Sequence, residues 1–125
     1  MLTINTEKAP AAVGPYSQAI VSHGMVYTSG QIAIDPATNT VKGTTIEEQT
    51  EQIMKNIQAI LEEASSSFDL AVKTTCFLAD MNDFADMNGI YAEFFSEPYP
   101  ARSAVAVKTL PKGAMVEIEV VASVA

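Results

Sequence analysis

Residues 115–124 alternate between two kinds of side chain, and this alternation limits the folds that the chain can adopt. Successive side chains of a β-strand point to opposite faces of the sheet. One face of this segment is purely apolar, whereas the other combines apolar side chains with two carboxylates, Glu117 and Glu119. The purely apolar face has to be covered, so we expect helices against it. Glu117 and Glu119 then lie on a face that no helix covers.

Two segments are predicted to form the covering helices. The first begins at a capping box, Thr45–Glu48, and continues with apolar residues at 3.6-residue spacing to the serine run 65–67. The second begins at residue 82 or 83 and ends before Pro98, because the residue preceding a proline is disfavoured in a helix. Its apolar face consists of Phe84, Met87, Tyr91, Phe94 and Phe95.

The remaining regular segments are rich in β-branched and aromatic residues and are predicted to be strands. They are residues 18–21, 25–29, 31–34, 72–78 and 102–108. The first two flank His23-Gly24 and indicate a hairpin. With the closing strand, the order β-β-(β)-α-β-α-β-β predicts an α+β two-layer sandwich. In it, both helices cover one face of a mixed six-stranded sheet.

Length and composition narrow the classes of protein. The 125 residues fit one domain, 1–125. A net charge of −8 with only seven Lys plus Arg residues disfavours a nucleic-acid partner. The apolar runs are too short to span a bilayer, and the first residues lack the basic and apolar regions of a secretory signal. We therefore expect a cytoplasmic protein without a membrane partner.

The chain has a single cysteine, Cys76, and a single histidine, His23. One cysteine excludes an internal disulfide framework and a cysteine-based metal cluster, so no metal site is expected. His23 lies in a predicted turn, which disfavours a Ser/His/Asp triad. Cys76, in the middle of a strand, is expected to be a small buried hydrophobic residue. Catalysis would then depend on arginine, carboxylates, tyrosine, hydroxyl groups and backbone amides.

Arg102 is the best candidate for binding an anion. It alternates with Val105 and Val107, so that if the valines face the helices, Arg102 lies on the uncovered face with Glu117 and Glu119. A hairpin between the two closing strands would bring Arg102 toward the carboxylates. A partly apolar uncovered face also favours self-association. The pattern alone fits either a small-carboxylate site at an interface or an exposed cross-strand Arg–Glu pair.

Five short motifs follow one another in order along nearly the whole chain. They are Ala9–Gln18, Thr28–Ile32, Val72–Thr75, Asp80–Phe84, and Pro100–Ser103 with its continuation through Leu110–Gly113 to Val116–Glu119. In this order they resemble the RidA/YjgF/UK114 family. The resemblance implies a chorismate-mutase-like α+β fold assembled as a homotrimer, with three sites in clefts between subunits.

The resemblance also implies an activity and the residues that perform it. Members of the RidA branch hydrolyse 2-imino acids, released by pyridoxal-phosphate dehydratases, to 2-keto acids and ammonia without a cofactor. Arg102 matches the arginine that binds the substrate carboxylate, and Glu117 matches the glutamate that activates water. The other matching positions are Tyr16, which lines the cleft from a neighbouring subunit, Ser29 and Gly30 in its wall, and Asn88 on a nearby helix.

Ala104 departs from the family pattern. Many members carry a cysteine two residues after the arginine, whereas this chain has Ala104 on the same side of the strand as Arg102. The pocket therefore lacks a thiol there, and Cys76 does not align with that cysteine. We expect the roles of Arg102 and Glu117 to be retained, with a possible difference in substrate preference or in sensitivity to thiol reagents.

Two other functions remain open at this stage. One is a ribonuclease or translation inhibitor, an activity also attached to parts of the family; the charge of −8 disfavours it. The other is a non-enzymatic regulatory module that binds a small carboxylate as a signal. Hydrolysis is favoured over binding alone because Glu117 is retained alongside Arg102.

Overall fold

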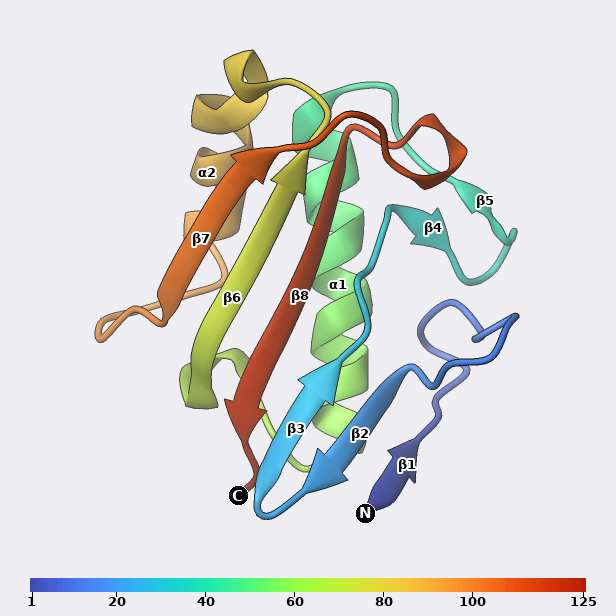
Figure 1. Ribbon diagram of the computed structural model, residues 1–125, viewed down its shortest axis with the longest axis vertical. Coiled ribbons are helices and arrows are strands. Elements are labelled where there is room, and N and C mark those ends of the chain that lie inside the picture. The colour runs from blue at the N-terminus through green and yellow to red at the C-terminus, as the bar shows by residue number, and fades with distance from the viewer.

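The computed structural model describes residues 1–125 and places two helices behind one face of a six-stranded sheet (Figure 1). The elements are β1 Leu2–Ile4, β2 Ala19–Ser22, β3 Met25–Thr28, β4 Ile34–Asp35, β5 Thr40–Val41, α1 Ile46–Glu63, β6 Ala71–Leu78, α2 Phe84–Ala92, β7 Ala101–Ala106 and β8 Val116–Ser123. The predicted α+β two-layer architecture is confirmed. No helix is both long enough and apolar enough to cross a membrane.

The large sheet has the strand order β1-β2-β3-β8-β6-β7. All neighbouring strands are antiparallel except β6 and β7, which are parallel. The sixth strand is β1, which the sequence did not indicate. Of the predicted strand 31–34, Gln31 makes only a single bridge to Ile118, and Ile34 belongs to the separate β4–β5 ribbon.

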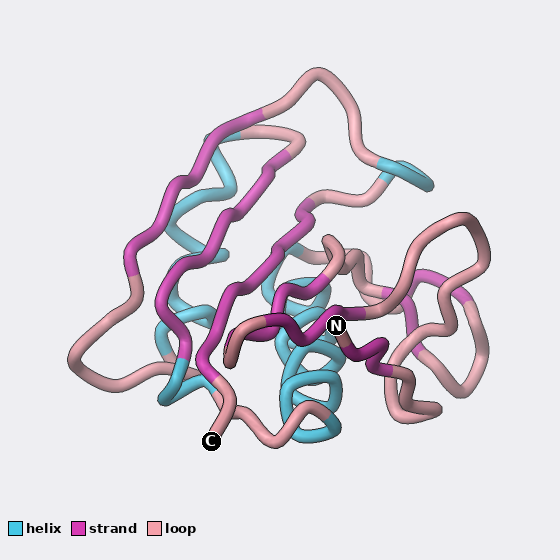
Figure 2. Tube along the Cα trace, turned by 60° about the horizontal axis from the view of Figure 1, so that its bottom comes forward, coloured by secondary structure: helices cyan, strands magenta, loops and turns pink.

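The prediction that the two closing strands form a hairpin is wrong, because β6 lies between β7 and β8 and pairs with both. The connection from β7 to β8 arches past the end of β6 (Figure 2). There the amide of Val107 donates to the Leu78 carbonyl at 2.9 Å, and the amide of Ala79 donates to the Met115 carbonyl at 3.0 Å. Parallel strands need a long crossover connection, and the segment containing α2 supplies it between β6 and β7.

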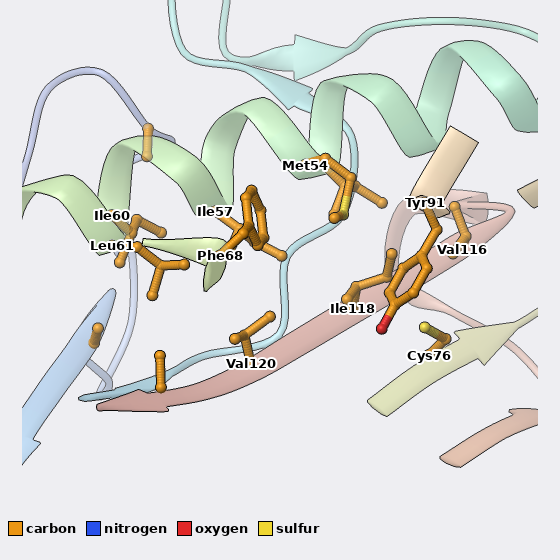
Figure 3. Packing of buried hydrophobic residues seen from close by; sticks show 14 of the residues in the cluster. Met54, Ile57, Ile60, Leu61, Phe68, Cys76, Tyr91, Val116, Ile118 and Val120 are labelled. Carbon is orange, nitrogen blue, oxygen red and sulfur yellow. The ribbon is translucent and has the colours of Figure 1, made fainter. Parts of the chain in front are cut away.

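The core lies between α1 and the apolar face of β8 (Figure 3). The predicted alternation is confirmed, since Val116, Ile118, Val120 and Ala122 are buried and the residues between them are partly exposed. The capping box is also confirmed. The Thr45 hydroxyl accepts from the Glu48 amide at 3.2 Å, and the Glu48 carboxylate accepts from the Thr45 amide at 3.1 Å.

Helix α2 is shorter than predicted and ends at Ala92, well before Pro98. Phe94 and Phe95 follow the helix and pack edge-on against Phe68, with ring centroids 5.7 and 5.0 Å apart. Both rings are half-buried against the core although the backbone there is no longer helical. His23 lies in the β2–β3 turn with a positive φ of 51°, as expected for a turn residue.

Candidate functional site

Arg102 borders an open hollow of about 470 Å³ between α2 and the segment that leads into β7. We call it the Arg102 hollow; its lining residues are Asn88, Tyr91, Ala92, Tyr99, Pro100 and Arg102. Arg102 is the only arginine of the chain, and its side chain is partly buried. Of the residues predicted to form the site, this hollow unites Arg102 and Asn88.

The Arg102 guanidinium is held by three side chains of α2. Its Nη1 donates to the Asn88 amide oxygen at 2.6 Å. Its Cζ lies 4.7 Å from the ring centroid of Tyr91 and 5.4 Å from that of Phe84. These distances are within the range of cation–π contacts. The arginine is therefore oriented before any ligand arrives, and a planar guanidinium in this position suits bidentate capture of a carboxylate.

The prediction that Arg102 lies on the helix-free face is wrong. Arg102 is the strand neighbour of Thr74, whose side chain is fully buried on the helix side, and it contacts α2. The prediction assumed that Val105 faces the core, but β7 is an edge strand and Val105 is exposed on the open face. Ala104 lies on the same side as Arg102, as predicted, but it pairs with Cys76 and lines no hollow.

The other predicted residues converge on a second hollow of about 370 Å³, which we call the Glu117 hollow. It is lined by Tyr16, Ser29, Gly30 and Glu117 together with Pro10, Val13, Gln31, Ile32, Ile34, Pro111 and Lys112. Gly30 permits a close approach, because a Cβ added there would overlap the Glu117 carboxylate, with its Cδ only 2.9 Å away. Tyr16, Ser29, Gly30 and Glu117, which the resemblance implies for the site, thus line one hollow.

The electrostatic environment of Glu117 makes its carboxylate more basic. Partial burial, and secondly the negative charge of Glu119, raise the pKa of Glu117 above its ordinary value. No hydrogen bond to the Glu117 carboxylate lowers its pKa in return. A carboxylate in these surroundings can accept a proton from a water molecule more readily than an exposed glutamate can.

Gln18, which the sequence analysis did not single out, holds the N-terminal segment against the Glu117 hollow. Its buried amide nitrogen donates to the carbonyls of Thr6 and Pro10 at 3.0 and 2.8 Å, and its amide oxygen accepts from the Thr6 amide at 2.7 Å. The Ser29 hydroxyl donates to the Ser17 carbonyl at 2.5 Å. In the sequence, Gln18 could have been noticed as a polar amide at the start of an apolar run, directly after a loop that contains two prolines.

Arg102 and Glu117 do not meet within one chain. On β6, Thr74 is the strand neighbour of Arg102, and Phe77 is the strand neighbour of Glu117. These two positions are three residues apart, so Arg102 and Glu117 lie on opposite faces of the sheet. Each hollow therefore holds half of the predicted constellation. No group of three His, Cys, Asp or Glu side chains is arranged to hold a metal ion.

Comparisons with known proteins agree on one family. The family model described as endoribonuclease L-PSP matches residues 6–124. A Lactococcus lactis protein that carries the name of a regulator, AldR, is 54% identical over 99% of this chain and 98% of its own length. The human 2-iminobutanoate/2-iminopropanoate deaminase is 46% identical over 95% of this chain and 87% of its own length. The crystal structure of Escherichia coli TdcF with bound serine superposes with a TM-score of 0.94 at 39% identity, covering 100% of both chains.

Proposed function

Because the chain belongs to the endoribonuclease L-PSP family, we propose that it is an imine deaminase that converts 2-imino acids to 2-keto acids and ammonia. We further propose that two copies of the chain build each site together, in a homotrimer. The observation that carries the proposal is the division of the chemistry between the Arg102 hollow and the Glu117 hollow. One chain carries a carboxylate anchor and a basic carboxylate in separate hollows, and in this proposal a second copy brings them together.

The helix-free face of the sheet supports self-association. By strand register this face carries the apolar side chains Ile20, Tyr27, Phe77, Val105 and Val121. Tyr27 and Val105 are each 47% exposed. An apolar patch of this kind on a small protein is typical of a contact surface. Glu117 and Glu119 lie on the same face, so that association through it would further enclose the Glu117 carboxylate.

The proposed reaction is the addition of water to the C=N bond, followed by loss of ammonia. Arg102 binds the 2-carboxylate and fixes the position of C2. The imine reacts in its protonated form, so that Glu117 of the neighbouring copy accepts a proton as the water oxygen bonds to C2 and a neutral carbinolamine results. The proton is returned to nitrogen, the C–N bond breaks, ammonia leaves, and loss of the hydroxyl proton forms the C=O bond of the 2-keto acid. No cofactor takes part in these steps.

A second candidate function is a regulatory module that binds a small carboxylate without converting it. The regulator name of the Lactococcus lactis relative favours it, and the serine bound to the Escherichia coli protein is a small amino acid that such a site would also accept. The two candidates differ in turnover alone. An RNA-cleaving function has less support, because the chain has a charge of −8 and one arginine.

The first experiment measures turnover directly. A threonine or serine dehydratase generates the imine in a buffer without free amines, and release of the 2-keto acid is followed with and without this protein. We expect faster release when the protein is present. An unchanged rate, together with binding of serine or a keto acid, would support the regulatory module instead.

The second experiment tests whether sites lie between copies. Arg102→Ala and Glu117→Gln variants, each with strongly reduced activity alone, are unfolded together and refolded as mixed oligomers. Since a shared site takes Arg102 from one copy and Glu117 from another, random mixing of equal amounts restores about a quarter of the sites. A site within one chain would restore none, and recovery no greater than for the separately refolded variants would contradict the proposal.

A further inference from the structure

The long side chain of Arg102 has to be held in one conformation to bind a carboxylate well. It stands on β7, the edge strand of the sheet, where only β6 flanks it. A long side chain with several rotatable bonds loses much conformational freedom when it is fixed on a ligand, and this loss weakens binding. Contacts that fix the guanidinium in advance therefore strengthen the site.

Helix α2 provides these contacts from one of its faces. Phe84, Asn88 and Tyr91 follow one another at spacings of four and three residues, which places them on the same side of the helix. Asn88 engages one nitrogen of the guanidinium, and the two aromatic rings lie against it. Of the two rings, that of Tyr91 is closer to Cζ, at 4.7 Å.

The ring of Tyr91 is itself fixed on two sides. Its hydroxyl forms a 2.8 Å hydrogen bond with the Thr74 hydroxyl, and Thr74 is fully buried in the strand position that neighbours Arg102. Its ring packs against Phe95 with centroids 4.6 Å apart. Tyr91 is only 6% exposed and enters the same core as Ile118 and Cys76 (Figure 3). Tyr91 thus links two strand neighbours: it is hydrogen-bonded to Thr74 of β6 and lies against Arg102 of β7.

We propose that Tyr91 is a positioning residue for the carboxylate anchor, with its ring supporting the Arg102 guanidinium and its hydrogen bond to Thr74 holding the ring in place. This inference rests on the proposed function insofar as it assigns the anchoring of a substrate carboxylate to Arg102. Although Tyr91 also lines the Arg102 hollow, the role assigned to it here acts through the guanidinium. Removal of Tyr91 therefore affects the binding of the carboxylate more than the later proton transfers.

The first test observes the guanidinium itself. Arg102 is the only arginine, so selective ¹⁵N labelling of arginine gives a single set of side-chain signals that needs no assignment. We expect slow rotation about the Nε–Cζ bond in the natural protein and clearly faster rotation in Tyr91→Leu. Phe94→Leu is the matched control, because it removes an aromatic contact with Phe68 near the same helix end but none with Tyr91 or Arg102. Equal rotation rates in Tyr91→Leu and in the natural protein would overturn the proposal.

The second test separates positioning from a general effect on folding. We expect Tyr91→Leu to raise KM for the imine about 10-fold, with kcat changed less than about 2-fold. Phe94→Leu should leave KM unchanged even if it lowers the melting temperature. A rise in KM that follows the loss of melting temperature across both variants would indicate a purely structural role and overturn the proposal.

A gentler pair of variants keeps the test valid if Tyr91→Leu does not fold. Tyr91→Phe and Thr74→Val each remove the same hydrogen bond while keeping the aromatic ring. We expect each to raise KM about 3-fold, and the double variant to raise it no further, because both act through one interaction. Full additivity, or no change in any of the three, would contradict the proposal. Absence of turnover in the natural protein would reject the proposed reaction, whereas the NMR experiment would still decide the role of Tyr91.

Discussion

The Arg102 hollow and the Glu117 hollow differ in how far one chain completes their chemistry. In the first, an amide oxygen and two aromatic rings hold the charged group. In the second, the carboxylate lies against a bare backbone at Gly30, and burial and a neighbouring negative charge raise its pKa. The cation is fixed and supported, whereas the anion is closely fitted but electrostatically unsupported.

This difference matches the two roles that we propose. A guanidinium stays charged at any physiological pH, so support from neighbours fixes its geometry without changing its charge. A carboxylate supported by several donors would have a low pKa and would be a poor base. Leaving Glu117 without such support preserves its basicity. An anchor and a base thus need opposite surroundings, and here these surroundings lie on opposite faces of one sheet.

The largest expected effect comes from removing the anchor. Arg102→Ala should lower kcat/KM about 1,000-fold, because no other cation lines the Arg102 hollow to bind the 2-carboxylate. The coupled dehydratase assay measures the loss, and a Lys in place of Arg102 should retain part of the activity as a single point charge. Unchanged kcat/KM in the Ala variant would remove the Arg102 hollow from the mechanism.

Removing the base should have the next largest effect and should appear mainly in kcat. Glu117→Gln keeps the shape of the side chain but cannot accept a proton, so we expect kcat to fall about 100-fold. Binding of a keto acid, measured by calorimetry, should change little. A variant that loses binding but keeps kcat would show that Glu117 anchors the ligand and does not act as a base.

The pH dependence of kcat/KM tests the role of Glu117 as a base, and Glu119 provides a way to shift it. Glu117 is active only when ionised, so kcat/KM falls as the pH decreases through its pKa, and the raised pKa moves this fall to higher pH than for an ordinary glutamate. Glu119→Gln removes one negative charge and should lower the pKa of Glu117. The acid limb of the pH profile then shifts to lower pH but stays above the ordinary range, because burial remains. A shift to higher pH would contradict this assignment.

A smaller effect is expected at Gly30, where backbone and carboxylate touch. Gly30→Ala forces Glu117 to move, and we expect kcat to fall about 10-fold through this displacement. Gly89→Ala in α2 is the control, since nothing lies within 4 Å of the added methyl group. That control should keep its activity and gain about 0.5–1 kcal/mol of stability from the helix preference for alanine. Equal kcat in both variants would mean that the close fit at Gly30 is not needed.

The parts of the fold that local patterns determine were predictable from the sequence. The capping box at Thr45, the turn at His23 and the alternation in β8 each depend on residues a few positions apart, and the structure confirms all three. The sequence did not show that β6 lies between β7 and β8, because strand order depends on the path of the crossover through α2. Neighbours in sequence are not always neighbours in a sheet.

The candidate site was predicted as a set of residues but not as an arrangement. Strand alternation placed Arg102 and Glu117 on one face, whereas the structure places them on opposite faces. The cleft between subunits that the resemblance implies stays a prediction. The error at Arg102 came from Val105, since an edge strand can expose a valine that a central strand would bury. Tyr91 was predicted only as part of an apolar helix face, because periodicity does not show that a ring lies against a guanidinium.

The smallest effect concerns thiol reagents and Cys76, which lies on β6 as the strand neighbour of Ala104. Cys76, the only thiol, is fully buried, and burial raises its pKa to about 11, so almost none of it is the reactive thiolate at neutral pH. We expect N-ethylmaleimide to leave the folded protein unmodified by mass spectrometry and its activity unchanged within about 2-fold. The same reagent in denaturant should add one adduct, which serves as the control for reagent quality.

Replacing Ala104 tests where a reactive thiol would act. Ala104→Cys places a thiol on the same side of β7 as Arg102, and the nearby guanidinium favours its thiolate form. We expect this variant to be modified in the folded state and to lose activity, with KM affected before kcat because the adduct blocks the anchor. The base on the opposite face would keep its raised pKa. Modification of Cys76 in the folded natural protein would show that the core beneath Arg102 opens, and the fixed anchor inferred from its contacts would then not hold.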